Sequence, residues 1–179
     1  MKKNLILLLV TCFFSMTAFS QDDIVSYTKV NQQIPDFSIK DIKGNEFKIA
    51  DQKGKVVLIY FWTTWCPYCR LEMKLIEEEI WQKIKDSPHF TFLAIAREET
   101  DELITKYQKA NKFTFPIAAD PKGEVFKLFG NRGVPRSYLI NPEGKIVAQT
   151  VGLGLDEIEN RQKLLIKELT KLEKQNKKK

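Results

Sequence analysis

The sequence predicts an α/β domain built around a mixed β-sheet with helices on both faces. Three observations predict this class: two largely apolar runs of strand length, an amphipathic helical segment after each, and a hairpin pattern late in the chain. The apolar runs cover residues 56–62 and 90–96, and continuous runs of this kind are typical of strands buried on both faces. At 179 residues, the chain is long enough for one such domain and its core.

Alternating apolar and polar side chains predict a β-hairpin near the start of the domain. Residues 34–42 alternate, residues 43–45 carry a turn signal, and residues 46–49 return. The apolar strand 56–62 follows and leads directly into a helix over residues 67–85, whose apolar side chains recur near the 3.6-residue helical period. The hairpin therefore precedes a strand–helix unit.

The second apolar strand completes a β-α-β crossover with the first. A helix over residues 98–112 follows it, then a short extended segment at 115–119 and a brief helix at 124–129. Strands at 137–140 and 145–150 are expected to pair as a hairpin. An antiparallel hairpin beside a parallel crossover is what makes the predicted sheet mixed.

The last part of the chain predicts a long amphipathic helix with a basic end. The helix opens at or near Asp156. Its apolar packing face is formed by Ile158, Leu165, Leu169 and Leu172. Much of the excess positive charge lies at Lys171, Lys174, Lys177, Lys178 and Lys179. We expect residues 173–179 to be a solvated tail rather than a contact for nucleic acid or lipid.

The first 20 residues have the pattern of a secretory signal peptide. Lys2 and Lys3 precede an apolar run, and small residues lead up to Ser20, after which we expect cleavage. The formal charge of +6 then falls to about +4, because two lysines and no acid are removed. The mature protein is expected to be exported to the periplasm or another extracytoplasmic space. A retained membrane anchor and lipidation at Cys12 are the alternatives.

Two cysteines separated by two residues lie where the first apolar strand meets its helix. Pro67 fits the first helical turn, and side chains three residues apart on a helix are neighbours at about 5–6 Å, which suits a disulfide. The amides and the dipole at a helix start favour a thiolate, so we expect the pKa of Cys66 to be lowered. A thiolate attacks disulfides and a second thiol resolves the product. Cys66 is therefore the expected nucleophile, and the deeper Cys69 is the resolving thiol.

Two other roles for this pair have weaker support. The two cysteines could be two of the four ligands of a structural zinc site, but the only histidine of the chain is His89. A structural disulfide across one helical turn closes too short a loop to constrain the unfolded chain much. In an exported chain, two cysteines this close indicate a redox motif rather than a structural disulfide.

Two separated motifs resemble those of the thioredoxin superfamily. They are Trp62-Thr63-Thr64-Trp65-Cys66-Pro67-Tyr68-Cys69 and Gly133-Val134-Pro135. The early hairpin, the insert at residues 115–129 and the late hairpin resemble its exported TlpA/ResA-like branch, over residues 34–172, with residues 21–33 as a lead-in. The resemblance implies a three-layer α/β/α fold with a central mixed sheet, an N-terminal β-hairpin extension and an insert after the second helix.

The resemblance also implies roles for residues around the dithiol. Pro135 would be cis and would place the Val134 backbone where an extended substrate segment can pair with it; an ordinary trans proline is the alternative. Glu72 matches a carboxylate of this branch, one turn beyond Cys69, where it can exchange a proton with that thiol. A plain surface glutamate is the alternative there. Cytoplasmic thioredoxins carry a buried Asp where this chain has Tyr60, which favours Glu72 for proton transfer.

The expected substrate contacts lie on both sides of the dithiol. They are Trp65, Pro67, Tyr68, Val134, Pro135 and Arg136. Arg136 is expected to add a positive charge beside the dithiol, where it favours the thiolate or selects an acidic substrate.

The resulting prediction is an exported thiol-disulfide oxidoreductase that reduces protein disulfides, for example in apocytochrome c. It would act as a monomer, take electrons from a membrane dithiol carrier and need no metal or cofactor beyond the Cys66–Cys69 disulfide. One alternative is a peroxidase of the peroxiredoxin type, whose P-x-x-x-T-x-x-C motif fits Thr63, although Ile59 replaces the proline. The other is a copper-carrying module of the same fold, which uses C-x-x-x-C and a distant histidine.

Overall fold

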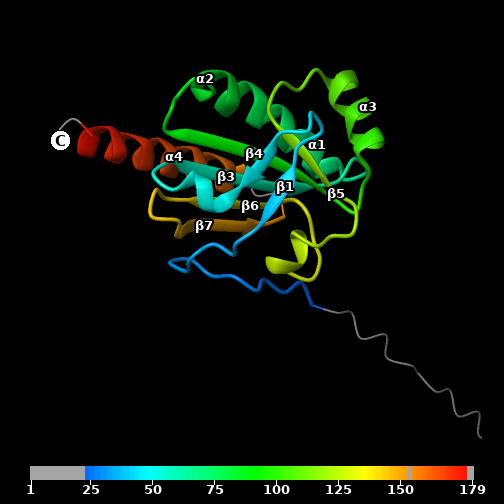
Figure 1. Cartoon of the computed structure of the whole chain (residues 1–179), viewed down its shortest axis with the longest axis horizontal. Helices are drawn as coiled ribbons and strands as arrows, with labels where there is room; N and C mark the ends of the chain where they lie inside the picture. Colours follow the sequence, from blue (N-terminus) through cyan, green and yellow to red (C-terminus); the bar gives the residue numbers. More distant parts are fainter. Residues whose placement is uncertain (1–22, 153–154, 177–179) are drawn as a thin grey trace, which may run out of the picture.

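A five-stranded mixed sheet forms the centre of the protein, in a computed structural model that describes residues 23–152 and 155–176 (Figure 1). Its strand order is β5-β4-β3-β6-β7. The strands are β3 (Val56–Trp62), β4 (Phe90–Arg97), β5 (Ile117–Asp120), β6 (Arg136–Ile140) and β7 (Ile146–Val151). The first three run parallel, whereas β6 is antiparallel to β3 and β7 is antiparallel to β6. The predicted mixed sheet is confirmed.

The central strand β3 is buried along its whole length because both of its faces are covered. Alternate side chains point to opposite faces of a strand. Tyr60 and Trp62 accordingly belong to the core beneath the helices, whereas Ile59 and Phe61 belong to a second core on the other face. This double burial explains why the strand is a continuous apolar run in the sequence.

The α-helices cover one face of the sheet (Figure 1). α1 (Pro67–Leu75) continues through a π-helical segment, Ile76–Trp81, into α2 (Gln82–Ile84), so the helix predicted over 67–85 is one helical run with a wider middle turn. α3 (Asp101–Asn111) connects β4 to β5. Two crossovers that step in the same direction along a parallel sheet place their helices on the same face.

The long C-terminal helix α4 (Leu155–Asn176) joins α1 and α3 on that face. Leu165, Leu169 and Leu172 are buried, as predicted for its packing face. The side chain of Ile158 lies outside the described residues. The helix continues four residues beyond Leu172, into the stretch expected to be a solvated tail.

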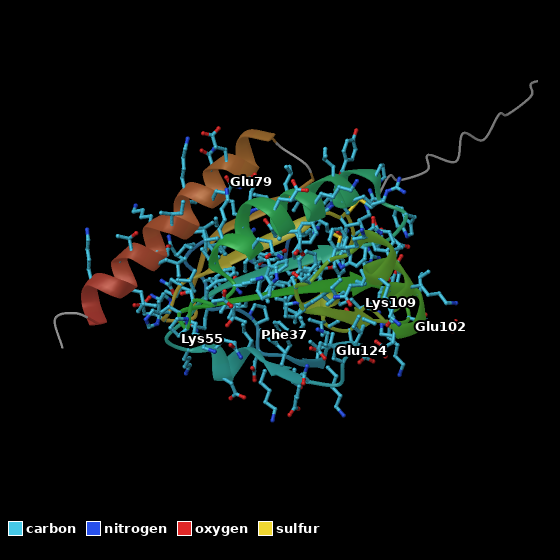
Figure 2. The ribbon with its side chains drawn as sticks, turned by 90° about the horizontal axis from the view of Figure 1, so that it is seen from above. Phe37, Lys55, Glu79, Glu102, Lys109 and Glu124 are labelled. Atoms are coloured by element: carbon cyan, nitrogen blue, oxygen red, sulfur yellow. A yellow bond between two sulfur atoms is a disulfide. The ribbon has the colours of Figure 1, made fainter. Side chains whose placement is uncertain are left out.

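The opposite face is covered by the hairpin β1 (Ser38–Lys40) and β2 (Glu46–Lys48) and by two 3-10 turns, Ile49–Gln52 and Phe126–Leu128. Figure 2 shows Phe37 between this hairpin and the sheet. The sequence predicted α-helices on both faces, but no α-helical residue of the described ranges contributes to this second core. Aromatic rings take that place: Phe61 lies 5.4 Å from Phe126 and 5.0 Å from Phe129, centroid to centroid.

Two predicted helices are shorter than expected, and each has a polar group at its start. α3 begins at Asp101 rather than near residue 98, because the Thr100 hydroxyl accepts a hydrogen bond from the Leu103 amide as an N-cap. The brief helix expected at 124–129 is only a 3-10 turn. Its Phe126 amide donates to the buried carboxylate of Asp120 at 2.8 Å.

The lead-in predicted for residues 21–33 is bound to the domain over the part that the structure describes. The Tyr27 amide donates to the Phe129 carbonyl at 2.9 Å, and the Asn31 amide donates to the Ile146 carbonyl at 2.8 Å. The predicted signal peptide lies outside the described residues. Within the described ranges, none of the helices is both long and apolar enough to cross a membrane.

Candidate active site

The dithiol lies where strand β3 ends and helix α1 begins. Cys66 is the N-cap residue of α1, and Pro67 is its first helical residue, as predicted. A disulfide joins Cys66 to Cys69, whose Cα atoms are 5.2 Å apart. The Cys69 amide donates to the Cys66 sulfur at 3.1 Å, so a helix-start amide faces the expected nucleophile. Cys66 retains 4 % exposure and Cys69 has none, the order expected for attacking and resolving thiols.

The second sequence motif meets the first across the top of the sheet. The Val134–Pro135 peptide bond is cis. The carbonyl oxygen of Val134 lies 3.8 Å from the Cys66 sulfur, although 68 residues separate the two in sequence. The loop before β6 therefore lies directly against the dithiol, as the resemblance implied.

Exposed apolar side chains surround the dithiol. Trp65 and Tyr68 are 72 % and 61 % exposed, and Pro67 is exposed between the cysteines. Leu71, on the next turn of α1, is also exposed. Large aromatic groups in water are suited to contact a partner chain. These positions are compatible with the predicted substrate contacts, which stay predictions.

Glu72 is buried one turn beyond Cys69, with 1 % of its surface exposed. Its carboxylate pairs with the Arg161 guanidinium of α4 and accepts a hydrogen bond from the Tyr60 hydroxyl at 3.2 Å. The same hydroxyl lies 3.4 Å from the Cys69 carbonyl oxygen. Glu72 is thus no ordinary surface glutamate: it belongs to a polar cluster of Tyr60, Glu72 and Arg161 beneath the resolving cysteine.

Tyr60 is locked in its neutral form within this cluster. Burial, and after it the negative charge of Glu72, raises the pKa of Tyr60 well above its ordinary value of 10.0. The hydroxyl therefore keeps its proton and can act as a donor to Glu72 at physiological pH.

Arg161 was not among the residues predicted for the site. It is 3 % exposed, and its other terminal nitrogen donates to the Thr150 hydroxyl at 3.3 Å. A signal was present in the sequence, because Arg161 precedes Leu165 by four residues and so shares the packing face of α4. A charged side chain on an otherwise apolar face needs a buried partner.

Glu99 is a second buried carboxylate that sequence reasoning missed. It accepts hydrogen bonds from the Thr64 amide at 2.9 Å and from the Thr64 hydroxyl at 2.6 Å. The turn after β4 thereby fixes the loop between β3 and Cys66. The helix predicted over residues 98–112 includes Glu99, whereas the Thr100-Asp101 pair is the signal in the sequence that the helix starts later.

The expectation that Arg136 places a charge beside the dithiol is wrong. Its side chain is fully buried and lies with Tyr138 on the face of β6 opposite α1. The guanidinium donates to the Val25 carbonyl at 3.0 Å and to the Ser26 hydroxyl at 2.8 Å, and its Nε atom donates to the Gly133 carbonyl at 3.0 Å. Arg136 therefore binds the N-terminal segment to the loop before β6.

The single histidine lies at the far end of the sheet from the dithiol. His89 precedes Phe90, which pairs with Val56 at the start of β3, whereas Cys66 follows the other end of that strand. A strand of seven residues spans about 20 Å. Across residues 23–152 and 155–176, no group of three or more His, Cys, Asp or Glu side chains is placed to hold a metal ion.

Known proteins share both this fold and this pair of cysteines. Residues 30–149 match the sequence model of the AhpC/TSA family. The chain is 31 % identical to thiol-disulfide oxidoreductase ResA of Bacillus thuringiensis subsp. konkukian, over 85 % of this chain and 91 % of that protein. It is 33 % identical to sporulation thiol-disulfide oxidoreductase A of Bacillus subtilis, over 65 % of this chain and 70 % of that protein.

Solved structures agree with these relatives. A Bacteroides thetaiotaomicron protein proposed to be a protein disulfide isomerase superposes with a TM-score of 0.80 at 31 % identity, over 83 % of this chain and 94 % of that one. StoA from Bacillus subtilis superposes with a TM-score of 0.58 at 29 % identity, over 68 % of this chain and 90 % of that one. Because the AhpC/TSA model covers more than half of the sequence and the ResA relative is matched over nearly its whole length, the chain belongs to the AhpC/TSA family and, within it, to the ResA-like thiol-disulfide oxidoreductases of thioredoxin fold.

Proposed function

We propose that this thiol-disulfide oxidoreductase works outside the cytoplasm as a reductant of disulfides in client proteins. The observation that supports this most directly is the position of Cys66. Its sulfur caps α1, accepts the Cys69 amide and lies beside the Val134 carbonyl of the cis-proline loop. A sulfur at a helix start is favoured as a thiolate, and the loop offers backbone groups to an extended client segment.

The reaction begins when the Cys66 thiolate attacks one sulfur of a client disulfide. A mixed disulfide forms between Cys66 and the client, and the other client sulfur leaves as a thiolate that takes up a proton. Cys69 then loses its proton and attacks the Cys66 sulfur. The mixed disulfide breaks, the Cys66–Cys69 disulfide forms, and the client is left with two thiols. Two electrons have passed from the protein to the client.

The proton of Cys69 is the difficult part of the second step, because this thiol is buried. Glu72 is our candidate for its acceptor, since the carboxylate lies one turn away and is linked to the Cys69 backbone through Tyr60. Arg161 and Tyr60 hold the carboxylate in place. They are positioning residues in this mechanism.

The cellular setting of the proposal rests on the sequence of the N-terminus. A signal peptide over residues 1–20 would deliver a monomeric protein to the periplasm or another extracytoplasmic space. There a membrane dithiol carrier would reduce the Cys66–Cys69 disulfide again. Apocytochrome c is one client class that fits a reductant in this place, and the proposed substrates include no nucleic acid.

Trapping tests the assigned roles of the two cysteines. Cys69→Ser protein should accumulate as mixed disulfides with clients, because Cys66 still attacks and nothing resolves the product. Cys66→Ser protein should trap none. If only the Cys66→Ser protein traps clients, the roles are reversed.

Two turnover assays test the reaction itself. Pre-reduced wild-type protein should cleave the interchain disulfides of insulin, and the Cys66→Ser protein should not. Rapid turnover of hydrogen peroxide with intact insulin would instead support the peroxidase alternative, for which Thr63 fits the motif and Ile59 does not.

A further inference from the structure

A pocket of about 430 Å³ opens beside the dithiol, between the loop before α1 and the loop before β6. Its lining residues are Thr63, Trp65, Arg97, Glu98, Arg132, Gly133 and Val134. Val134 also contacts the Cys66 sulfur, so the pocket lies next to the attacking atom. Whatever occupies it is held close to the bond that reacts.

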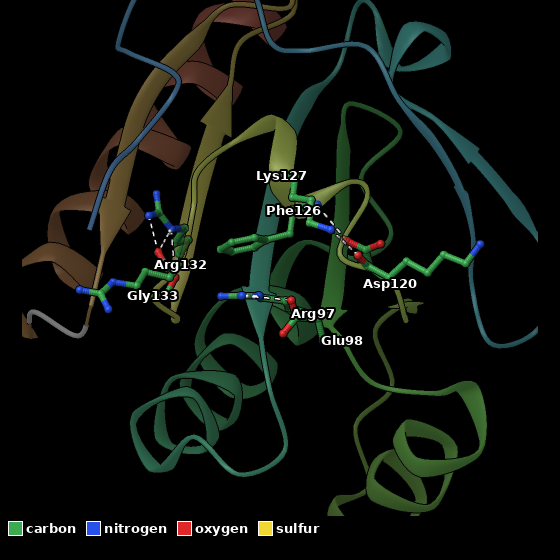
Figure 3. Close-up of polar contacts among 9 residues, drawn as sticks. Arg97, Glu98, Asp120, Phe126, Lys127, Arg132 and Gly133 are labelled. Atoms are coloured by element: carbon green, nitrogen blue, oxygen red, sulfur yellow. Dashed lines mark hydrogen bonds and ion pairs between the residues drawn. The ribbon is translucent and has the colours of Figure 1, made fainter. Parts of the chain in front are cut away.

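Arg97 is fixed in the wall of this pocket. Its guanidinium stacks over the Phe126 ring, 4.3 Å from the centroid, and one terminal nitrogen donates to the Glu98 carboxylate at 3.1 Å. Figure 3 shows Arg97 below Phe126, between Glu98 and the loop that carries Arg132 and Gly133. Only 20 % of the Arg97 side chain is exposed. A guanidinium held in advance loses little conformational entropy when it binds a ligand.

Arg132 lines the opposite side of the pocket, and its backbone is fixed as well. The Arg132 carbonyl accepts a hydrogen bond from Nε of the buried Arg136 at 3.1 Å. The lining residues thus include two arginines and one glutamate, an excess of one positive charge around the pocket. Arg136 does not supply this charge and instead supports the loop that carries Arg132.

The pocket also gathers buried polar groups that lack partners. In the described part of the chain, seven buried side-chain nitrogen or oxygen atoms make no hydrogen bond, and three of them belong to residues of this pocket: Thr63 Oγ1, Arg97 Nε and Arg132 Nε. Thr63 is only 3 % exposed. Each of these three atoms carries a polar hydrogen that no acceptor in the described part of the chain neutralises, so they add to the positive potential of the pocket wall. A ligand group with negative charge matches this wall.

We propose that this pocket binds the carboxylate of an acidic side chain that lies near the reactive cysteine of a client protein. The inference rests on the proposed function, because the client disulfide must reach Cys66 at the same time. A guanidinium fork matches a carboxylate with two parallel hydrogen bonds. The pocket thus gives the enzyme a preference for disulfides flanked by Asp or Glu.

Matched peptides test this preference. Two cyclic disulfide peptides differ only in carrying Glu or Gln beside each cysteine, and their reduction by pre-reduced protein is quenched with acid and followed by mass spectrometry. We expect the wild type to reduce the Glu peptide roughly tenfold faster at low salt. Arg132→Gln should lower this ratio to about twofold or less, and Arg132→Glu should favour a Lys peptide instead. Arg70→Gln is the control, because this exposed arginine lies on α1 outside the pocket.

Each result decides one point. Equal rates for the Glu and Gln peptides with the wild type, or an unchanged ratio in both Arg132 variants, would overturn the subsite and leave the reductase function intact. If the wild type reduces neither peptide nor insulin, the proposed function itself fails. If glutathione disulfide is reduced as fast as the Glu peptide and with the same dependence on Arg132, the pocket serves a small disulfide that carries its own carboxylates, and the assignment to client side chains is wrong.

Discussion

The carboxylate of Glu72 is the most constrained single group near the dithiol. It is buried, paired with Arg161 and bonded to Tyr60, so it makes charge-assisted contacts with two other elements. Breaking a buried ion pair costs far more than breaking an exposed one, because the remaining charge has lost its hydration and its partner together. The pair also ties α4 to α1, directly beneath Cys69.

Replacing Arg161 with Met should therefore destabilise the oxidised protein by about 3–5 kcal/mol, measured by urea denaturation. Adding Glu72→Gln to this variant should recover part of the loss, because no unpaired charge is then buried. Lys163→Met is the matched control on the same helix, since its partner Glu159 is exposed. A loss no larger than that of the control would contradict a buried, paired state of Glu72.

Tyr60 should make the stability of the protein depend on pH in the alkaline range. The unfolded phenol titrates near its ordinary pKa of 10.0, whereas burial and Glu72 hold the folded pKa well above that value. The folded state then binds more protons than the unfolded state above pH 10, so this contribution to stability falls as the pH rises through that range. Its slope is at most about 1.4 kcal/mol per pH unit.

The Tyr60→Phe protein should lack this alkaline loss. At pH 7 it should be less stable than the wild type by about 1–3 kcal/mol, because the buried Glu72 carboxylate loses a hydrogen-bond donor. The gap should narrow steadily above pH 10 in a series of urea denaturations. Tyr68→Phe is the control, since Tyr68 is exposed. A constant gap between pH 7 and pH 11 would show that Tyr60 does not titrate abnormally.

At the scale of elements, the loop between β3 and α1 owes its shape to the turn after β4. The Glu99 carboxylate binds both the amide and the hydroxyl of Thr64, two residues before Cys66. The aromatic contact of Trp62 with Tyr107 of α3, 5.1 Å between ring centroids, supports the same region from the helix side. The loop that carries the nucleophile is thus positioned by its own helix α1 and also by the segment from the end of β4 through α3.

Glu99→Gln should weaken this hold without removing a side chain. We expect a loss of about 1–3 kcal/mol in stability, because the charge-assisted hydrogen bonds to Glu99 Oε1 become neutral ones and an NH2 group replaces Oε2, which also accepts from the Thr64 amide. We also expect slower insulin reduction, since the Cys66 loop is less well placed. Glu102→Gln is the control, because Glu102 on α3 is exposed and pairs with the exposed Lys106. Equal stability and rate in the two variants would rule out a positioning role for Glu99.

The elements that the sequence predicted well are those with a local cause. β3 is apolar throughout, and β4 is apolar except at Thr91 and Arg97, because both faces of these strands are covered. The Cys66–Cys69 pair lies at a helix start marked by Pro67. The distant partners of Glu72, Glu99 and Arg136 were not predicted: Arg161 lies 89 residues from Glu72, Thr64 lies 35 residues from Glu99 and Val25 lies 111 residues from Arg136. Periodicity assigns a residue to a face but does not say which distant charge it meets there.

At the scale of the whole molecule, the N-terminal segment connects the second core to the active-site side of the sheet. The Val25 carbonyl accepts from Arg136 and from the Asn131 amide, and the Asn131 side chain accepts from the Val25 amide at 2.8 Å. Arg136 in turn donates to the Arg132 and Gly133 carbonyls, in the loop that contacts Cys66. A chain of hydrogen bonds therefore runs from residues 23–27 to the cis-proline loop.

Removing this segment should affect stability and activity together. A chain of residues 34–179 should unfold at lower urea than the predicted mature chain of residues 21–179, by about 3–5 kcal/mol, because several backbone hydrogen bonds of about 1 kcal/mol each are lost. Its insulin reduction should also slow, since Arg136 loses the Val25 and Ser26 acceptors that orient it. Asn131→Ala in the mature chain should show both effects at smaller size, with a loss of stability near 1 kcal/mol.

If the shortened chain matched the mature chain in both stability and rate, the segment would only cover the second core. Slower reduction at unchanged stability in Asn131→Ala would instead locate its effect in the cis-proline loop alone.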